Sequence, residues 1–221
     1  MYFHKFTMEY KKHFLAEFFG TFLLLFIATG SIIISEQYNG VISPTGLSAV
    51  CGITVWLLIQ FFGRVSDCHI NPAVTICFFA DGVIPMQRAF LYILLQLLGS
   101  FLASLLLHFL FPTNRDLGNT LPTVTWEATF ILEFFLSLIL ILVILIATSN
   151  ERLKRLAPFL IGLTIFLEIW LAGPICGASM NPARSFGPAV VSGNSSFLWL
   201  YFVAPIVGML TGLFVFRLLR K

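Results

Sequence analysis

Long apolar stretches separated by short polar connections fill most of the chain. Six of these stretches approach the length of about 20 apolar residues that a helix needs to cross a bilayer. They cover residues 14–34, 47–63, 89–111, 127–148, 157–173 and 197–217. None shows the alternating pattern of a membrane β-barrel, and lipid cannot satisfy the backbone of an open sheet. The pattern therefore predicts an all-α membrane protein with six transmembrane helices.

Two shorter apolar runs, 74–80 and 185–191, lie between the long stretches and cannot span a bilayer. Each follows an Asn-Pro-Ala motif, and the two Asn residues are 110 positions apart (181 − 71). Asn caps a helix start and Pro suits the first helical turn. The motifs consist of Asn71, Pro72 and Ala73, and of Asn181, Pro182 and Ala183. Paired short helices between membrane spans are typical of a site built from re-entrant half-helices at the membrane midplane.

A second pair of motifs indicates an internal repeat. Glu-Phe-Phe occurs inside the first and fourth apolar stretches, with Glu17 and Glu133 116 positions apart (133 − 17). The repeat halves are about 1–111 and 126–221, and we expect them to form a single channel domain because neither would complete a site alone.

Composition and charge place this architecture in a membrane. The chain of 221 residues is 58% hydrophobic and 10% charged, with a mean hydropathy of +0.95, whereas soluble domains are about 25% charged. If the N-terminus is cytoplasmic, all 13 Lys and Arg residues except Arg115 and Arg184 fall on the cytoplasmic side, as the positive-inside rule requires. Both termini are then cytoplasmic, and the half-helices enter from opposite sides as an inverted repeat. We expect an integral protein of the plasma (inner) membrane.

The two Asn residues are the first candidates for function. If the half-helices meet end to end, both positive dipole ends point at the membrane centre and repel cations. The amides of Asn71 and Asn181 can then donate to a neutral guest such as water, while their oxygens cap the helices. Simple capping without a guest is the alternative, and the pairing favours the functional interpretation.

Glu17 and Glu133 are ionisable residues inside membrane spans, where such residues are usually functional or paired. They could relay protons, or accept hydrogen bonds from the backbone of the re-entrant loops. Their symmetric placement favours this loop-supporting role. His69 fits a hydrogen-bonding strut or a gate equally well, and Glu168 could face a partner helix, the pore or a loop.

Arg184 directly follows the second motif. It could be a surface charge, but one turn into a half-helix that enters from outside it would lie at the outer mouth. There it would donate to passing oxygens and repel cations.

The chain shows no spacing typical of a catalytic or metal-binding set. Its four Cys residues lie in or beside apolar segments, where buried free thiols are expected. The sequence thus predicts neither an enzyme nor a protein that binds a cofactor, a metal or a nucleic acid.

Together these motifs resemble the major intrinsic proteins, the aquaporins and aquaglyceroporins. The resemblance covers the whole chain and rests on Ala-Glu-Phe-Phe-Gly-Thr (16–21), His-Ile-Asn-Pro-Ala-Val-Thr (69–75) and Gly-Ala-Ser-Met-Asn-Pro-Ala-Arg-Ser-Phe-Gly-Pro-Ala (177–189). It implies an aquaporin-like fold, a homotetramer in membrane lipid with one pore per subunit, and passive flow of water or small neutral solutes without ions or protons.

The resemblance also implies a selectivity constriction, formed here by Cys51, Ile169, Ala178 and Arg184. Water-selective members resemble one another in a bulky aromatic residue and a His at the first two positions. Both are replaced here by smaller, less polar side chains, which implies a wider and more apolar constriction. The set is most similar to plant-type intrinsic proteins and their bacterial relatives that pass glycerol, urea or undissociated metalloid acids.

Other positions resemble strictly water-selective channels. Ser185 stands where glycerol facilitators typically carry Asp, and Ala189 and Tyr201-Phe202 are also similar to water channels. Asp67-Cys68 departs from the Gly-Ala that the family usually has before the first motif. Water selectivity therefore stays open as an alternative.

Inverted repeats and broken helices also occur in ion-coupled secondary transporters, but no cluster of Asp residues lies inside a span. A junction protein and an intramembrane enzyme are weaker rivals, because the outer loops are short and no catalytic set is present.

Overall fold

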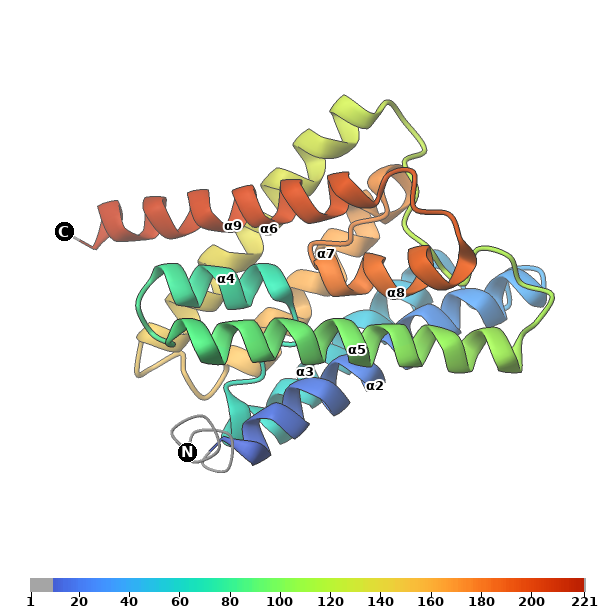
Figure 1. Cartoon of the computed structure of the whole chain (residues 1–221). Helices are drawn as coiled ribbons and strands as arrows, with labels where there is room; N and C mark the ends of the chain where they lie inside the picture. Colours follow the sequence, from blue (N-terminus) through green and yellow to red (C-terminus); the bar gives the residue numbers. More distant parts are fainter. Residues whose placement is uncertain (1–9, 221) are drawn as a thin grey trace.

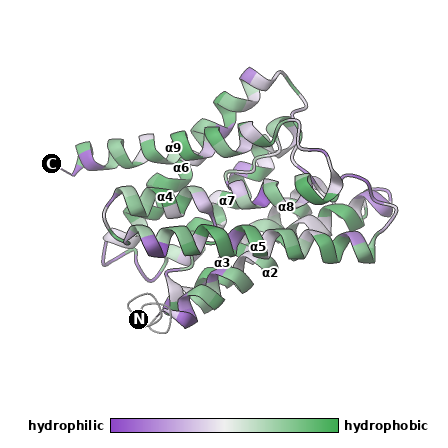
Figure 2. Cartoon of the chain, viewed as in Figure 1, coloured by the Kyte–Doolittle hydropathy of each residue, from purple (hydrophilic) through white to green (hydrophobic). Residues whose placement is uncertain are grey.

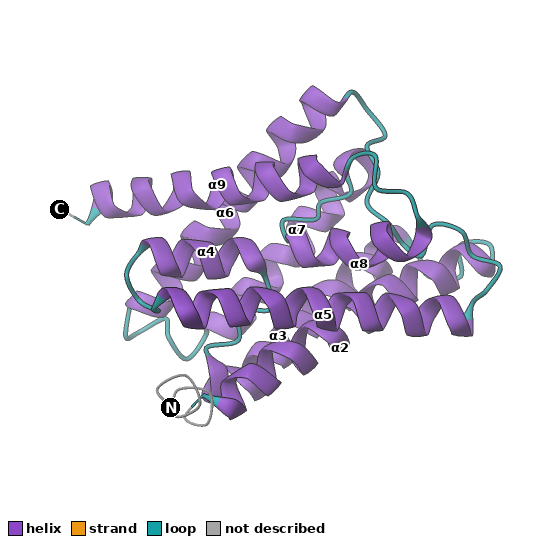
Figure 3. Cartoon of the chain, in the orientation of Figure 1, coloured by secondary structure: helices purple, strands orange, loops and turns teal. Residues whose placement is uncertain are grey.

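The computed structural model describes residues 10–220, and within that range it contains eight helices and no strand (Figure 3). Six helices are long: α2 (Lys11–Gln37), α3 (Pro44–Ser66), α5 (Met86–Leu110), α6 (Trp126–Ser149), α7 (Ala157–Cys176) and α9 (Leu198–Leu219). Two are short: α4 (Pro72–Ala80) and α8 (Pro182–Ser192). All six long helices are apolar and long enough to cross a membrane. The six predicted spans and the two predicted half-helices are confirmed.

Capping residues start several of these helices. Ser43 Oγ accepts from Gly46 N at 3.1 Å ahead of Pro44 at the start of α3. Thr125 Oγ1 accepts from Ala128 N at 3.3 Å at the start of α6. These side chains satisfy backbone N–H groups that have no partner within the first helical turn.

The long helices turn many apolar side chains outwards, and polar residues concentrate at the helix ends and connections (Figure 2). Only 28% to 56% of each span's most apolar window is buried inside the protein. Apolar surface of this extent is unfavourable in water but suits contact with lipid chains. The protein is therefore an integral membrane protein.

The fifth span ends later than the sequence predicts. The expected end at Gly173-Pro174 is wrong, because α7 continues to Cys176 and ends at Gly177 in the left-handed region with φ +85°. Thr123 Oγ1 donates to the carbonyl oxygens of Pro174 at 3.0 Å and Ile175 at 2.7 Å. The loop before α6 thus supplies partners for the last carbonyls of α7, and a Pro in the final turn is tolerated.

The helices pack in two equivalent sets (Figure 1). Helix α2 packs against α3 and α5, and α6 packs against α7 and α9 in the same way. The short helices cross between the sets, because α4 packs against α9 and α8 packs against α5. Each half therefore buries the half-helix of the other beside its own last span.

Helices α3 and α7 cross at a close contact between two glycines. A Cβ atom on Gly52 would lie 2.6 Å from the carbonyl oxygen of Gly162, and the reverse distance is also 2.6 Å. Only glycine allows two backbones to come this close. The crossing brings Cys51 on α3 and Ile169 on α7 to the wall of the same cavity.

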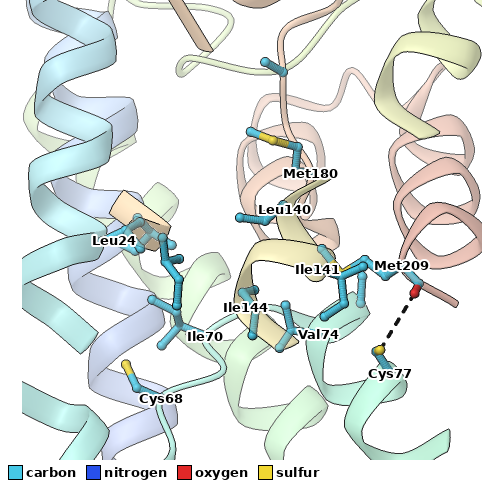
Figure 4. Packing of buried hydrophobic residues seen from close by; sticks show 14 of the residues in the cluster. Leu24, Cys68, Ile70, Val74, Cys77, Leu140, Ile141, Ile144, Met180 and Met209 are labelled. Carbon is cyan, nitrogen blue, oxygen red and sulfur yellow. Dashed lines mark hydrogen bonds between the residues drawn. The ribbon is translucent and has the colours of Figure 1, made fainter. Parts of the chain in front are cut away.

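One apolar cluster joins the half-helices to the spans (Figure 4). Ile70 and Met180, the residues directly before the two Asn residues, are buried at 4% and 2% exposure in this cluster with residues of α2, α6 and α9. The two loops are therefore packed elements of the core.

Candidate functional site

Helices α4 and α8 meet end to end at their N-termini (Figure 1). Asn71 Nδ2 donates to the carbonyl oxygen of Met180 at 2.8 Å, and Asn181 Nδ2 donates to the carbonyl oxygen of Ile70 at 2.9 Å. Each loop thus receives one hydrogen bond from the Asn of the other loop. This exchange fixes the distance between the two half-helices.

The amide oxygens of the Asn residues cap the half-helices, as the sequence predicts. Asn71 Oδ1 accepts from Ala73 N at 2.9 Å, and Asn181 Oδ1 accepts from Ala183 N at 3.0 Å. Each NH₂ group carries two hydrogens, of which the crossing bond uses one. The second hydrogen of each group remains for a guest, and both Asn residues line the cavity described below.

Glu17 on α2 holds the first loop with both carboxylate oxygens. Oε1 accepts from His69 N at 2.9 Å, and Oε2 accepts from Ile70 N at 2.7 Å. Two side chains also donate to this carboxylate, Ser66 Oγ at 3.1 Å and Gln96 Nε2 at 2.8 Å. Four donors make Glu17 the hydrogen-bonding centre of this loop.

Glu133 on α6 holds the second loop in the equivalent way. Its oxygens accept from Ser179 N at 2.7 Å and Met180 N at 2.8 Å. Both Glu residues are fully buried. Irregular backbone at membrane depth needs such internal partners, because lipid supplies none.

A cavity of about 790 Å³ runs past the two Asn residues. At one end its wall contains the basic residues Arg64, Lys154 and Arg155, which we call the basic mouth. Apolar side chains of α2, α3, α6 and α7 form much of the remaining wall: Leu24, Val55, Leu140, Ile144, Ile161 and Ile165. Beyond the basic mouth, the polar partners that the wall offers a guest include the two Asn amides, His69 and Arg184.

The four residues expected at the constriction, Cys51, Ile169, Ala178 and Arg184, all line this cavity. Arg184 Nη1 donates to the carbonyl oxygen of Gly118 at 2.7 Å, so the loop between α5 and α6 fixes the guanidinium. Its remaining N–H groups are donors for a solute oxygen.

His69 combines backbone and ring contacts. Besides the backbone bond to Glu17, its Nδ1 lies 3.1 Å from Thr75 Oγ1, and its ring stacks on Phe78 at 4.9 Å between centroids. The ring also lines the cavity. These contacts hold the His69 side chain against the first loop, beside the cavity.

Asp67 and Cys68 adopt left-handed backbone conformations, with φ of 62° and 50°. Their counterparts in the second loop, Gly177 and Ala178, do the same with φ of 85° and 41°. Asp is one of the non-glycine residues that tolerate a left-handed backbone conformation. The unusual Asp67-Cys68 pair therefore keeps the loop conformation that the second loop shows.

Sequence reasoning did not identify Arg88 on α5, which clamps the first loop. Arg88 Nη2 donates to Asp67 Oδ2 at 2.9 Å and to Tyr92 Oη at 2.6 Å, and Tyr92 Oη donates to the carbonyl oxygen of Ser66 at 3.2 Å. The guanidinium also donates to His13 Nδ1 at 2.9 Å. Arg88 is one charge of the predicted cytoplasmic set, and no local pattern distinguishes it from the others.

The second loop has its own supports, which sequence reasoning also did not identify. Thr120 Oγ1 donates to Ser185 Oγ at 2.6 Å, and Ser179 Oγ lies 2.7 Å from the same atom. Ser100 Oγ on α5 donates to the carbonyl oxygen of Ala183 and accepts from Gly187 N. The Ser and Thr residues of the apolar helices follow no periodic pattern in the sequence that would mark them as loop supports. Ser100 does lie beside a glycine, Gly99.

The described part of the chain offers no metal site. Within residues 10–220, no group of three or more His, Cys, Asp and Glu side chains could hold an ion. The four Cys residues are free and buried.

Comparison with known proteins agrees with the site. Residues 5–216 match the major intrinsic protein family. Aquaporin NIP1-1 of Zea mays is 39% identical over 208 residues, which cover 93% of this chain and 74% of that protein. Nodulin-26 of Glycine max is 38% identical over 216 residues, covering 97% and 80%. The X-ray structure of the aquaglyceroporin from Plasmodium falciparum has a TM-score of 0.84 at 24% identity and covers 94% of this chain and 95% of that one, which shows the fold.

Proposed function

The chain belongs to the major intrinsic protein family, and from that membership we propose that it is a passive channel for water and for small neutral solutes. The solutes are glycerol, urea or undissociated metalloid acids, and ions and protons are excluded. The reciprocal Asn71 and Asn181 bonds carry this proposal, because they leave one amide hydrogen of each residue for a guest in the passage.

Water at this point would accept from both Asn residues with its single oxygen. Its two hydrogens then point away from the Asn pair, toward opposite mouths of the passage. A chain of waters oriented in this way cannot hand a proton across the middle, because neighbouring molecules there donate in opposite directions. The arrangement supports water flow without proton flow.

Cations meet both electrostatic repulsion and a cost of dehydration. The N-termini of α4 and α8 meet at the middle, where their dipoles present positive potential. Arg184 adds a full positive charge on the cavity wall, and the apolar walls do not replace the water that an ion must shed. A neutral solute avoids both costs.

Cargo depends on the four residues that we propose as the selectivity constriction. Cys51 and Ile169 are smaller and less polar than an aromatic residue and a His, which supports passage of a carbon-containing or metalloid solute beside Arg184. A strictly water-selective channel is the second candidate. It is favoured by Ser185, whose hydroxyl contacts Thr120 and Ser179 and brings no carboxylate next to Arg184.

An ion-coupled transporter is less well supported. Both carboxylate oxygens of Glu17 and of Glu133 accept backbone hydrogen bonds from the loops. These carboxylates therefore serve as fixed loop supports, and we propose that His69 is a strut of the same kind rather than a gate.

We further propose that the chain assembles as a homotetramer in the plasma (inner) membrane with both termini cytoplasmic. The distribution of Lys and Arg supports this orientation. In it, the basic mouth faces the cytoplasm and Arg184 lies toward the outside.

Stopped-flow light scattering on proteoliposomes tests the proposed function. Liposomes with the protein should shrink faster than empty liposomes in a sucrose gradient. In glycerol or urea gradients they should then re-swell, without any dependence on an ion gradient. Shrinkage without re-swelling would leave the water-selective alternative, and saturable uptake that requires an ion would contradict the channel.

A further inference from the structure

His69 in the first loop carries a ring nitrogen that has no partner in the described part of the chain. Its Nδ1 lies 3.1 Å from Thr75 Oγ1, but its Nε2 contacts no donor or acceptor among residues 10–220. Nε2 is also not one of the fully buried side-chain atoms that lack a partner there. It therefore reaches accessible space although the residue is only 6% exposed, and the space that His69 lines is the cavity.

The hydroxyl of Thr75 decides which ring nitrogen holds the hydrogen. Three polar atoms lie within hydrogen-bond distance of Thr75 Oγ1: the carbonyl oxygen of Asn71 at 3.1 Å, His69 Nδ1 at 3.1 Å and Gln96 Nε2 at 3.0 Å. A hydroxyl has one hydrogen to donate and two lone pairs that accept. All three contacts can be hydrogen bonds only if the hydroxyl donates once and accepts twice.

The carbonyl oxygen of Asn71 sets the direction of these bonds, because it can only accept. It takes the hydroxyl hydrogen of Thr75, and His69 Nδ1 must then donate to Thr75. If Thr75 donated to Nδ1 instead, its oxygen would face the Asn71 carbonyl oxygen at 3.1 Å with no hydrogen between them. That arrangement loses one of the three bonds.

The orientation of Gln96 is fixed independently by Glu17. Gln96 Nε2 donates to Glu17 Oε2 at 2.8 Å, and the same carboxylate accepts the backbone N–H groups of His69 and Ile70. The amide nitrogen of Gln96 therefore faces both Glu17 and Thr75, and its two hydrogens serve these two contacts. Thr75 has one lone pair left, which is available for the N–H of His69.

We infer that His69 is held as the neutral tautomer with its hydrogen on Nδ1, so that Nε2 is a bare acceptor at the cavity wall and positions the conducted molecule. A neutral imidazole has one N–H, and the hydrogen bond of one ring nitrogen fixes the state of the other. His69 thus supports the first loop through Nδ1 and accepts through Nε2 from an O–H or N–H group in the passage. The inference deepens the proposed function, on which the second of these roles rests.

An acceptor at this position fits the water orientation that the Asn pair sets. Water that accepts from Asn71 and Asn181 directs its hydrogens away from the middle of the passage. On the side of the first loop, the next water molecules also direct hydrogens outward, and Nε2 of His69 can accept one of them. A ring with its hydrogen on Nε2 would donate to a water oxygen and would not offer this acceptor.

The second loop replaces this imidazole by a hydroxyl. With the offset of 110 residues between the two motifs, Ser179 and Ser185 correspond to His69 and Thr75. Ser179 Oγ donates to the carbonyl oxygen of Asn181 at 3.0 Å and lies 2.7 Å from Ser185 Oγ, so both contacts use its single polar atom. The imidazole has a second polar atom outside the corresponding contact. A ring acceptor therefore distinguishes the first loop from the second.

Solid-state nitrogen NMR of the protein in liposomes, with isotopically labelled histidine at neutral pH, tests the tautomer. The His69 signals are those that His69→Phe removes. We expect a protonated Nδ1 and an unprotonated Nε2, and less protonation of Nδ1 in Thr75→Val, which removes the acceptor. A wild-type ring protonated on Nε2 or on both nitrogens would overturn the inference, and these signals decide the tautomer even if Thr75→Val does not fold.

Magnetisation transfer from water in the same samples tests whether Nε2 meets the conducted molecule. We expect transfer from water hydrogens to reach Nε2 of His69, because this atom lies at the cavity wall. A ring with a purely structural role would show no transfer to Nε2, and that result would overturn the positioning role. Both NMR results are independent of which solutes the channel passes.

Water flux measures the size of the effect. His69→Phe keeps an aromatic ring for the stack on Phe78 but removes the acceptor. We expect water permeability to fall about two- to tenfold, the factor that corresponds to one hydrogen bond of ordinary net strength. His108→Phe, the same change at an exposed position of α5, is the matched control and should keep the wild-type flux. Wild-type water flux in His69→Phe would overturn the role, whereas a wild-type protein that passes water but no glycerol or urea would contradict only the broader cargo of the proposed function.

Discussion

The two half-helix loops share a backbone plan but differ in what holds them. In both, an Asn caps the half-helix and bonds to the other loop, and a buried Glu accepts from two consecutive backbone N–H groups. Around the first loop, the supports are Ser66, Gln96 and the Arg88 clamp. Around the second loop, they are the hydroxyls of Thr120, Ser179, Ser185 and Ser100.

The two loops also differ in their surroundings within the cavity. The first loop is tied to α5 by a charged cluster near the basic mouth, and its Asp67 and Cys68 occupy left-handed positions. The second loop contributes Ala178 and Arg184 to the cavity wall, and Gly118 fixes the Arg184 guanidinium. From this comparison we propose that the shared Asn pair sets the passage, whereas the second loop and its neighbours select the cargo.

The largest loss of stability is expected when one of the two Glu side chains that hold the loops is removed. Glu17→Ala leaves two buried backbone N–H groups and the donors of Ser66 and Gln96 without their acceptor. Each unsatisfied buried group costs about 1–3 kcal/mol, which together approaches the whole stability of about 5–15 kcal/mol for an ordinary domain. Glu133→Ala should cost less, because fewer strong donors point at it. Thermal unfolding in detergent measures both, and equal losses would remove the asymmetry.

Substitutions of Arg184 and of Arg88 should have different effects, an increased ion leak for Arg184 and a lower stability for Arg88. A cation about 4–8 Å from Arg184 meets a repulsion of about 2–4 kcal/mol at an effective dielectric constant of about 20, so Arg184→Val should raise cation or proton leak about tenfold or more. Arg88→Leu should lower Tm without raising leak, since Arg88 is not part of the cavity wall. Ion-flux fluorescence in liposomes checks this pair. An unchanged leak in Arg184→Val would contradict its assigned role.

Exchanges at the left-handed position of each loop should have smaller effects. Gly177→Ala places a Cβ atom 3.1 Å from Thr120 at φ +85°, which should cost about 1–2 kcal/mol. Asp67→Gly relieves a similar strain but removes an ion pair whose Asp side chain is 60% exposed, worth about 0–1 kcal/mol. Its net change in unfolding free energy should lie within about 1 kcal/mol. A large loss for Asp67→Gly would show that the Arg88 clamp dominates this loop.

Replacing the cysteines of the cavity wall should change the flux of the untreated protein least of all the substitutions. Their effect should be seen in thiol labelling. Cys51 and Cys68 both line the cavity, but Cys68 Sγ donates to the carbonyl oxygen of Leu58 at 3.5 Å. If a mercurial blocks water flux, Cys51→Ser should relieve the block and Cys68→Ser should not. Block that persists in Cys51→Ser would place the reactive thiol elsewhere.

Local patterns in the sequence were enough to predict the spans, the half-helices and the caps. Apolar length marked the spans, and Asn followed by Pro marked both helix starts, because these signals involve neighbouring residues. The symmetric positions of Glu17 and Glu133 also indicated loop supports, and their hydrogen bonds have that form.

Contacts between distant residues could not be predicted in this way. Arg88 to Asp67, Gln96 to Glu17 and Thr120 to Ser185 join residues 21, 79 and 65 positions apart. Which polar side chain on an apolar helix faces a loop depends on how that helix is rotated in the packed protein. The predicted end of α7 was wrong for the same reason. The hydroxyl that donates to the carbonyl oxygen of Pro174 belongs to Thr123, which lies 51 positions away in the sequence.

The division of tasks between the proposed constriction and the first loop is tested most directly by two matched double variants in one stopped-flow assay. Cys51→Phe/Ile169→His places an aromatic residue and a His at the proposed constriction, and Asp67→Gly/Cys68→Ala gives the first loop the Gly-Ala of the second. The ratio of glycerol or urea permeability to water permeability should fall severalfold in the first variant and stay at the wild-type value in the second. A constant ratio in the first variant, or a shifted ratio in the second, would contradict the account.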